Sequence, residues 1–133
     1  MALAAYPRVR CAQGQLTLAQ INANTRVGTV IVPAEEGKTI TVVDGWMRAT
    51  GHTMAGCTAI ILTETGGSPT TITSTTAATL TAEAVIRMGV SGVTSTNVGT
   101  TMRPGRGLTI GCTVGDATTS HALDYCIFYT VAN

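Results

Sequence analysis

The alternation of apolar and polar side chains predicts β-strands along most of this chain. Residues 107–114 show it most clearly, with apolar side chains at every second position and glycine or threonine between them. This is the period of a half-buried strand. Residues 123–131 alternate as well, but apolar side chains fall on both faces. Such a strand lies in the middle of a sheet or is covered by a partner subunit.

Residues 27–51 predict two strands joined by a turn. Proline, two carboxylates and glycine occur together at residues 33–38, a combination typical of a solvated turn, and the flanking strands are expected to form a hairpin. The alternation after the turn changes phase at residues 44–45, which predicts a β-bulge. Trp46, the single tryptophan, follows the bulge and is interpreted as a core or interface anchor rather than a ligand-stacking residue.

Two short helical turns are expected between the strands. Thr17 and Gln20 form a capping box, with apolar residues at both positions of a hydrophobic staple. A helix is therefore expected to begin at Thr17 and to end within residues 22–24. Residues 76–90 contain both helical and alternating spacing. We interpret them as a short helical turn followed by a strand at residues 84–88.

The remaining segments complete an all-β pattern. An apolar run at residues 57–64 predicts a strand, residues 70–74 predict a short polar edge strand, and residues 91–107 predict a long surface loop. The expected fold is a single-domain antiparallel β-sandwich or jelly-roll-like domain over residues 15–133. An extended N-terminal arm at residues 1–14 is expected to precede it, because that segment has neither helical nor strand periodicity.

The composition narrows the classes of function. The chain of 133 residues is 44% hydrophobic and only 11% charged, against about a quarter charged residues in ordinary soluble domains. A surface with so little charge suits a protein that packs against neighbours. The net charge of +1 gives no sign of the basic stripe of a nucleic-acid binder, so no direct nucleic-acid partner is expected. No apolar run is long enough to predict a membrane span.

The sequence predicts neither a metal nor a cofactor. Cys11, Cys57, Cys112 and Cys126 are widely separated, and no histidine stands beside them at ligand spacing. We interpret them as structural cysteines that stay reduced in a cytosolic protein, while a disulfide remains an open alternative. No phosphate-binding glycine loop and no calcium loop occurs in the sequence.

The sequence also predicts that the protein is not an enzyme. The nearest approach to a catalytic set is Ser120, His121 and Asp124. Because sequence neighbours in a turn rarely form a catalytic triad, we expect no catalytic residues there. The carboxylates show no pair placed as a glycosidase requires.

Several motifs resemble small structural proteins of tailed double-stranded DNA phages. Residues 16–44 contain the order L-T-x-A-Q-I-N-A … V-I-V-P-A-x-x-G-K-x-x-x-V-x-D, and residues 80–87 (LTAEAVIR) and the closing strand are also similar. The resemblance is to head decoration (cement) proteins, which sit on the outside of the capsid, often as trimers. It implies a homotrimeric virion protein, made in the host cytoplasm, that binds the outer surface of the major capsid protein and stabilises the phage head. The alternative is a head-fibre or tail-associated β-module that binds a host glycan or another virion protein.

One aromatic and six charged residues of the arm and of two loops are the candidate contacts with the capsid or with other subunits. In an extended arm, an aromatic anchor and arginines would meet the carboxylates of a neighbour. Residues 103–107, R-P-G-R-G, either grip a phosphate or carboxylate or form a solvated loop. The complete set of candidates is Tyr6, Arg8, Arg10, Glu35, Glu36, Arg103 and Arg106.

Overall fold

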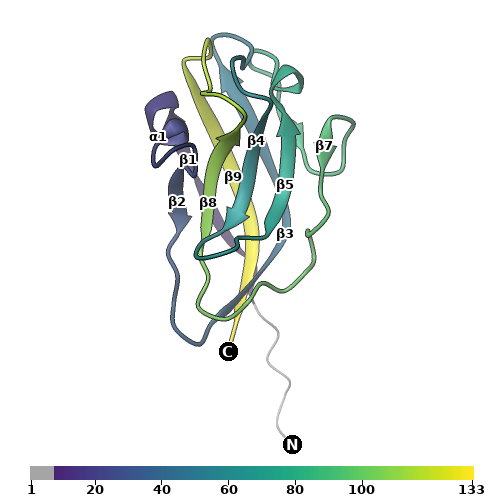
Figure 1. Ribbon diagram of the computed structural model, residues 1–133. Coiled ribbons are helices and arrows are strands. Elements are labelled where there is room, and N and C mark those ends of the chain that lie inside the picture. Colours follow the sequence, from purple (N-terminus) through teal and green to yellow (C-terminus); the bar gives the residue numbers. More distant parts are fainter. Residues whose placement is uncertain (1–7) are drawn as a thin grey trace, which may run out of the picture.

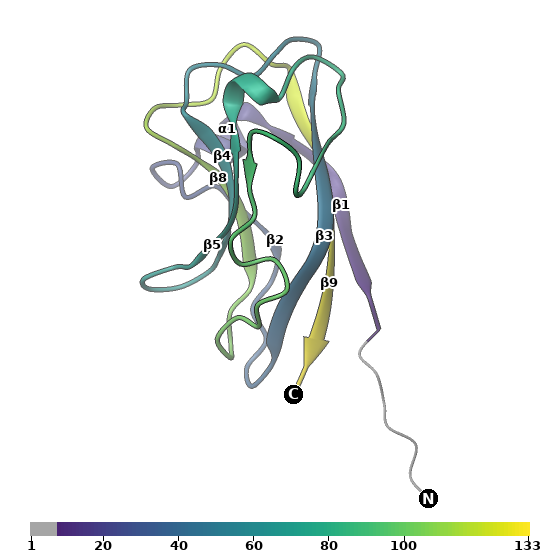
Figure 2. The ribbon, with the colours of Figure 1, turned by 90° about the vertical axis from the view of Figure 1, so that its right-hand side faces the viewer.

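Two antiparallel sheets pack face to face in the computed structural model, which describes residues 8–133 (Figure 1; the two layers are seen edge-on in Figure 2). This confirms the predicted all-β sandwich. The first sheet has the strand order β1 (Arg10–Thr17), β9 (Ala122–Ala132), β3 (Thr39–Thr50) and β6 (Ile86–Arg87). The second has the order β2 (Thr29–Val32), β8 (Leu108–Thr113), β4 (Ala59–Glu64), β5 (Thr71–Thr76) and β7 (Val93–Thr94).

Strand β1 changes the expected N-terminal boundary. Residues 10–14, which we expected to lie in the arm, belong to the sandwich. β1 begins at Arg10 and pairs with β9 along its whole length, from Arg10 opposite Tyr129 to Thr17 opposite Ala122. The strand has no apolar alternation that would predict it from the sequence, because an exposed edge strand tolerates polar residues on both faces.

The two predicted helical turns are confirmed. Helix α1 (Leu18–Asn22) is capped by Thr17, whose Oγ1 accepts a hydrogen bond from the backbone N–H of Gln20 at 3.2 Å, and the N–H of Thr17 donates to Oε1 of Gln20 at 2.9 Å. This reciprocal pair is the capping box read from the sequence. A 3₁₀ turn, η1 (Ala77–Thr79), precedes β6 as expected.

Strands β2 and β3 do not form the expected hairpin. β2 pairs with β8, whereas β3 pairs with β9 and β6, so the turn at residues 33–38 carries the chain from one sheet to the other. The predicted bulge is confirmed, because the register of β3 on β9 shifts between Val42 and Asp44. Another correction concerns β5, which is not an edge strand, since the two-residue strand β7 covers it.

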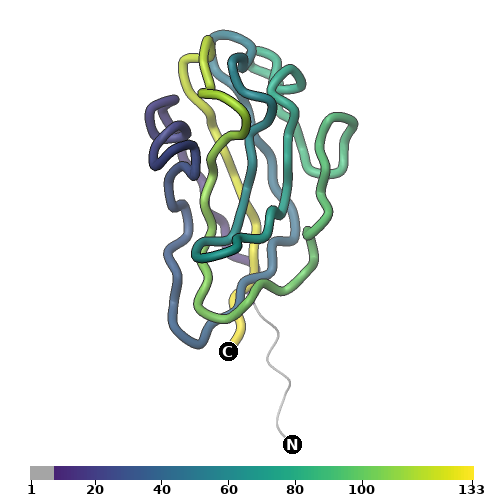
Figure 3. The backbone as a smooth tube through the Cα atoms, in the orientation of Figure 1, coloured from purple at the N-terminus to yellow at the C-terminus, as the bar shows by residue number. Residues whose placement is uncertain are grey.

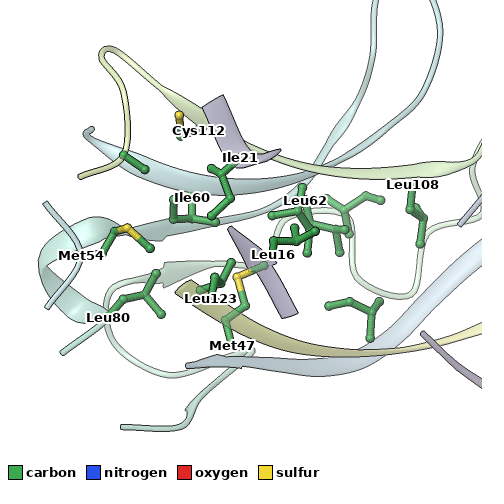
Figure 4. Packing of buried hydrophobic residues seen from close by; sticks show 14 of the residues in the cluster. Leu16, Ile21, Met47, Met54, Ile60, Leu62, Leu80, Leu108, Cys112 and Leu123 are labelled. Atoms are coloured by element: carbon green, nitrogen blue, oxygen red, sulfur yellow. The ribbon is translucent and has the colours of Figure 1, made fainter. Parts of the chain in front are cut away.

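The core lies between the sheets and extends beneath α1 (Figure 4). Strand β9 lies between β1 and β3, in the interior of its sheet as the sequence predicted. Trp46 is half-buried and stands opposite Arg87 of β6. Among the side chains buried completely are Ile21, Ile60, Leu62, Leu80, Leu108, Ile110, Leu123 and Ile127.

Candidate functional site

A cleft of about 210 Å³ opens at one end of the sandwich, between the edges of the two sheets. The turn at residues 33–38 and the C-terminal end of β9 lie at this end (Figure 3). We call it the basic cleft. It is lined by Arg10, Val32, Pro33, Glu35, Lys38, Ile40, Arg106, Tyr129 and Val131.

The cations of the basic cleft come from three separate parts of the chain. Arg10 opens β1 on the same face as Ala12, which packs against the core, and stands opposite Tyr129. Lys38 closes the turn before β3, where its backbone N–H donates to the carbonyl of Glu35 at 3.1 Å. Its Nζ donates to Oδ1 of Asn133 at the C-terminal end of the described chain.

Arg106 is held by main-chain groups of the β4–β5 turn. Its Nη1 donates to the carbonyl oxygens of Thr65 at 2.6 Å and Gly67 at 3.0 Å. These bonds fix the guanidinium of a residue that lines the cleft, and they satisfy two carbonyls of the turn. Arg106 is therefore a fixed positive charge, and it also stabilises the turn that it contacts.

The charges and the apolar surface of the basic cleft favour an acidic ligand. Three cationic side chains face one carboxylate, that of Glu35, so the local charge is positive although the chain as a whole is nearly neutral. Half-buried Tyr129 and Val131 add apolar surface. Arginine and lysine bind carboxylates through charge-assisted hydrogen bonds, and the apolar wall packs against the aliphatic part of such a side chain.

A second cleft, of about 410 Å³, lies where the β4–β5 turn meets residues 97–103. We call it the Glu64 cleft. The Glu64 side chain is 1% exposed, and its Oε1 accepts hydrogen bonds from Nε of Arg103 at 3.0 Å and from the N–H of Thr70 at 3.1 Å. Its Oε2 has no hydrogen-bond partner among the described residues. The lining residues are Glu64, Ser68, Thr70, Asn97, Thr100, Thr101, Met102 and Arg103.

Arg103 controls the ionisation of Glu64 and the position of the neighbouring loop. Burial raises the pKa of the Glu64 carboxyl, but hydrogen bonds from Arg103 and Thr70 outweigh burial and leave that pKa below its ordinary value. Arg103 also donates through Nη2 to the carbonyl of Ser68 at 2.6 Å. The same guanidinium thus joins the long loop before β8 to the β4–β5 turn.

The structure brings together only part of the predicted contact set. Arg10, Glu35 and Arg106 meet in the basic cleft, while Arg103 lines the Glu64 cleft. The two arginines of the R-P-G-R-G loop therefore face different clefts. Arg8 and Glu36 are exposed and line neither cleft, and Tyr6 lies outside the described residues.

Lys38 and Glu64 were missed as candidate site residues. Glu64 carried a usable signal, because its parity with Ile60 and Leu62 along β4 places it on the interior face of the strand. A carboxylate at an interior position requires a partner, here Arg103. Lys38 gave no comparable signal, because charged residues are ordinary in a turn.

Ser120, His121 and Asp124 do not converge. The hydroxyl of Ser120 donates to the main-chain carbonyls of Thr50 and Ala122. Asp124 accepts from Nη2 of Arg48 at 2.6 Å. The His121 ring packs edge-on against His52, with 5.0 Å between ring centroids.

Residues 8–133 contain no group of three or more histidine, cysteine, aspartate or glutamate side chains placed to hold a metal ion. No helix in this part of the chain is long and apolar enough to cross a membrane. Comparisons with models of protein families, with curated proteins and with solved structures each returned no match. The resemblance to phage decoration proteins therefore rests on the sequence motifs alone.

Proposed function

We propose that this chain is a structural virion protein that decorates the outside of a phage head and stabilises it by binding the major capsid protein. The basic cleft is the observation that carries the proposal, because it joins Arg10, Lys38 and Arg106 on an otherwise charge-poor molecule. The sequence motifs and the β-sandwich support the same function. Made in the host cytoplasm, the protein would act on the outer surface of the finished particle.

The basic cleft would receive an acidic segment of the major capsid protein. Arg10 is the best placed contact, since it is exposed and begins the strand that follows the N-terminal segment. Charges at the edge of an interface contribute mainly to orientation and association rate. Burial of a standard interface of about 1,600 Å² would supply most of the affinity, and repetition over a symmetric shell would add avidity.

A homotrimer is part of this proposal. The outer face of the first sheet carries Trp46 and Phe128, both only half-buried within one copy of the chain. Aromatic residues of this kind are enriched at protein interfaces. Light scattering on the isolated protein checks the oligomer, and a mass equal to one chain over the whole concentration range would contradict it.

Co-sedimentation with undecorated heads tests capsid binding. We expect the charge reversals Arg10→Glu and Lys38→Glu each to weaken binding by about tenfold or more, since a tenfold change corresponds to about 1.4 kcal/mol. Arg26→Glu is the matched control, because Arg26 pairs with Asp116 on the surface and does not line the basic cleft. Equal binding by all three variants and the unmodified protein would overturn the role of the basic cleft, and no binding by the unmodified protein would overturn the function.

The Glu64 cleft favours a second candidate function, binding of a host glycan by a head-fibre or tail-associated module. Its lining combines a buried carboxylate and an arginine with the hydroxyl and amide groups of Ser68, Thr70, Asn97, Thr100 and Thr101. Such groups suit a ligand rich in hydroxyls. Screening the protein against an array of bacterial surface glycans, with Thr100→Val as the variant that removes one lining hydroxyl, tests this candidate. Failure to bind any glycan would overturn this second candidate.

A further inference from the structure

Two cysteines from opposite ends of the chain meet on the outer face of the first sheet. Sγ of Cys11 on β1 lies 2.9 Å from Sγ of Cys126 on β9, although the two residues are 115 positions apart. Both are free thiols. Cys11 stands opposite Phe128, and Cys126 stands opposite Gln13. The two cysteines are therefore diagonal neighbours across the β1–β9 ladder.

This arrangement requires little movement to form a covalent bond. The sulfurs of a disulfide are about 2.05 Å apart, so the two thiols, now 2.9 Å apart, need to approach by less than about 1 Å to form the bond. The backbone already holds the strands together, because β1 pairs with β9 from Arg10 to Thr17. In an unfolded chain, the entropic cost of loop closure opposes pairing of cysteines that are far apart in the sequence. Folding has already brought these two cysteines together, so disulfide formation does not meet that cost again.

The two thiols differ in accessibility and acidity. Cys11 is exposed, whereas Cys126 is buried. Burial raises the pKa of Cys126 to about 11, and the hydrogen bond between the two thiols adds to that effect. A thiol–disulfide exchange therefore begins at Cys11, which an external disulfide can reach, and is completed by Cys126.

We propose that Cys11 and Cys126 are a redox-active pair that closes to a reversible disulfide when the protein meets a low-molecular-weight disulfide such as oxidised glutathione. The Cys11 thiolate attacks one glutathione sulfur, the glutathione disulfide bond breaks, and one glutathione leaves as a thiol. The Cys126 thiolate then attacks Sγ of Cys11 in the mixed disulfide and releases the second glutathione. Two protein thiols are oxidised, one glutathione disulfide is reduced to two thiols, and the two thiol protons pass to them.

The Cys11–Cys126 disulfide would hold the edge strand β1 in place on the sandwich. Among the described strands β1 pairs with β9 alone, so fraying of β1 is resisted by one ladder and by its few buried side chains. A Cys11–Cys126 bond would hold β1 against β9 at the position next to Arg10, which lines the basic cleft. The thiols stay reduced in a reducing cytosol and oxidise outside it. This inference does not depend on the proposed capsid function.

A second cysteine pair supplies the control. Cys57 also lies near Cys112, and burial followed by this neighbour raises the pKa of Cys57 to about 11. Cys112, however, is buried, and its thiol donates to Oδ1 of Asn22 at 3.3 Å and to the carbonyl of Gly115 at 3.4 Å. Neither thiol of this second pair has the exposure of Cys11, so Cys57→Ser should leave the proposed reaction intact.

The test is to incubate the folded full-length chain with oxidised glutathione, block the remaining thiols and map the products by mass spectrometry. Cys112 and Cys126 share the tryptic peptide 107–133, so an aspartate-specific protease is added to separate them before Asp116 and Asp124. We expect loss of two of the four thiols and a cross-link between peptides 11–26 and 124–133. Cys57→Ser should give the same cross-link and Cys11→Ser none.

Thermal melting of the reacted protein, after removal of glutathione, provides the second readout. The disulfide closes a ring of more than a hundred residues, so the midpoint should rise by about 10 °C and return on reduction. Cys11→Ser, treated in the same way, should show no rise. Retention of four thiols, a product that stops at glutathione on Cys11, or a cross-link confined to Cys57 and Cys112 would each overturn the proposal.

Discussion

Nε of Arg103 lies 3.0 Å from Oε1 of Glu64, a carboxylate whose side chain is 1% exposed while that of Arg103 is 49% exposed. The pair joins the end of β4 to the long loop before β8. Its unequal exposure matters, because solvent can still reach the arginine but not the carboxylate. Removing the arginine would leave the negative charge of Glu64 buried, with Thr70 as its remaining hydrogen-bond donor among the described residues.

Arg103→Gln should therefore destabilise the fold by about 2–3 kcal/mol. This is the lower end of the loss expected when one partner of a buried ion pair is removed, because Arg103 is partly solvated. The measurement is urea unfolding at neutral pH. Arg26→Gln is the matched control, since Arg26 pairs with Asp116 at 3.5 Å on the surface and should lose no more than about 1 kcal/mol. Equal losses in the two variants would show that Glu64 does not depend on Arg103.

The free energy of unfolding should decrease as the pH falls, because the stabilising contribution of Glu64 is lost at acid pH. Its pKa in the folded state lies below the ordinary value of 4.5, so the unfolded chain takes up the proton first as the pH falls. The contribution of Glu64 is complete above the ordinary pKa and is lost as the pH falls through the folded pKa. The difference in unfolding free energy between the unmodified protein and Glu64→Gln should therefore be largest near neutral pH and shrink at acid pH.

Asp124 also loses a stabilising contribution at acid pH, so the effect of Glu64 must be measured against the Glu64→Gln variant. Burial raises its pKa, but hydrogen bonds from Arg48 and Gln15 outweigh burial and lower it, so Asp124 also weakens the fold at acid pH. The Glu64→Gln variant keeps the Asp124 contribution, and only the difference between the two proteins reports on Glu64. A difference that stays constant from neutral to acid pH would contradict the prediction.

Gly28 should tolerate no side chain. It has φ +94°, and a Cβ built on it would lie 1.8 Å from the carbonyl oxygen of Ile110 on β8. Gly28→Ala should cost about 3 kcal/mol or more, because it combines an unfavourable backbone conformation with a clash against the main chain. Gly37→Ala is the control, with φ +73° and open space around the Cβ. It should cost about 1 kcal/mol, and similar losses in chemical unfolding would refute the argument.

Local signals in the sequence predicted local structure well. The capping box of Thr17 and Gln20, the bulge near Gly45 and the alternation of β8 and β9 were all recognisable, because each depends on residues close together in the chain. Pairing of β2 with β8 was not recognisable, because a short turn joins two strands in the same way whether they share a sheet or cross between sheets. Packing between residues far apart in the sequence determines whether the two strands share a sheet.

The candidate sites were predictable only in part, for the same reason. The sequence marked Arg10, Glu35 and Arg106 as charged residues of an extended arm, a solvated turn and a surface loop, but it gave no indication that a single cleft joins them. The contact between Cys11 and Cys126 depends on the pairing of β1 with β9. Since β1 lacks a clear apolar period, the sequence gives no indication that those two thiols lie together.

The boundary of the N-terminal segment gives the last prediction. Deleting residues 2–9 removes Tyr6 and Arg8 but leaves the ladder of β1 on β9 intact, because β1 begins at Arg10. The melting temperature should therefore change by no more than about 2 °C. Deleting residues 2–13 also removes the partners of Tyr129 through Cys126 and should lower the melting temperature by about 5 °C.

The same deletion separates two possible sites of capsid contact. If Tyr6 and Arg8 contact the capsid, the protein lacking residues 2–9 should co-sediment more weakly with undecorated heads while melting normally. Binding equal to that of the full chain would show that the segment makes no contact, and would leave Arg10, Lys38 and Arg106 of the basic cleft to hold the capsid.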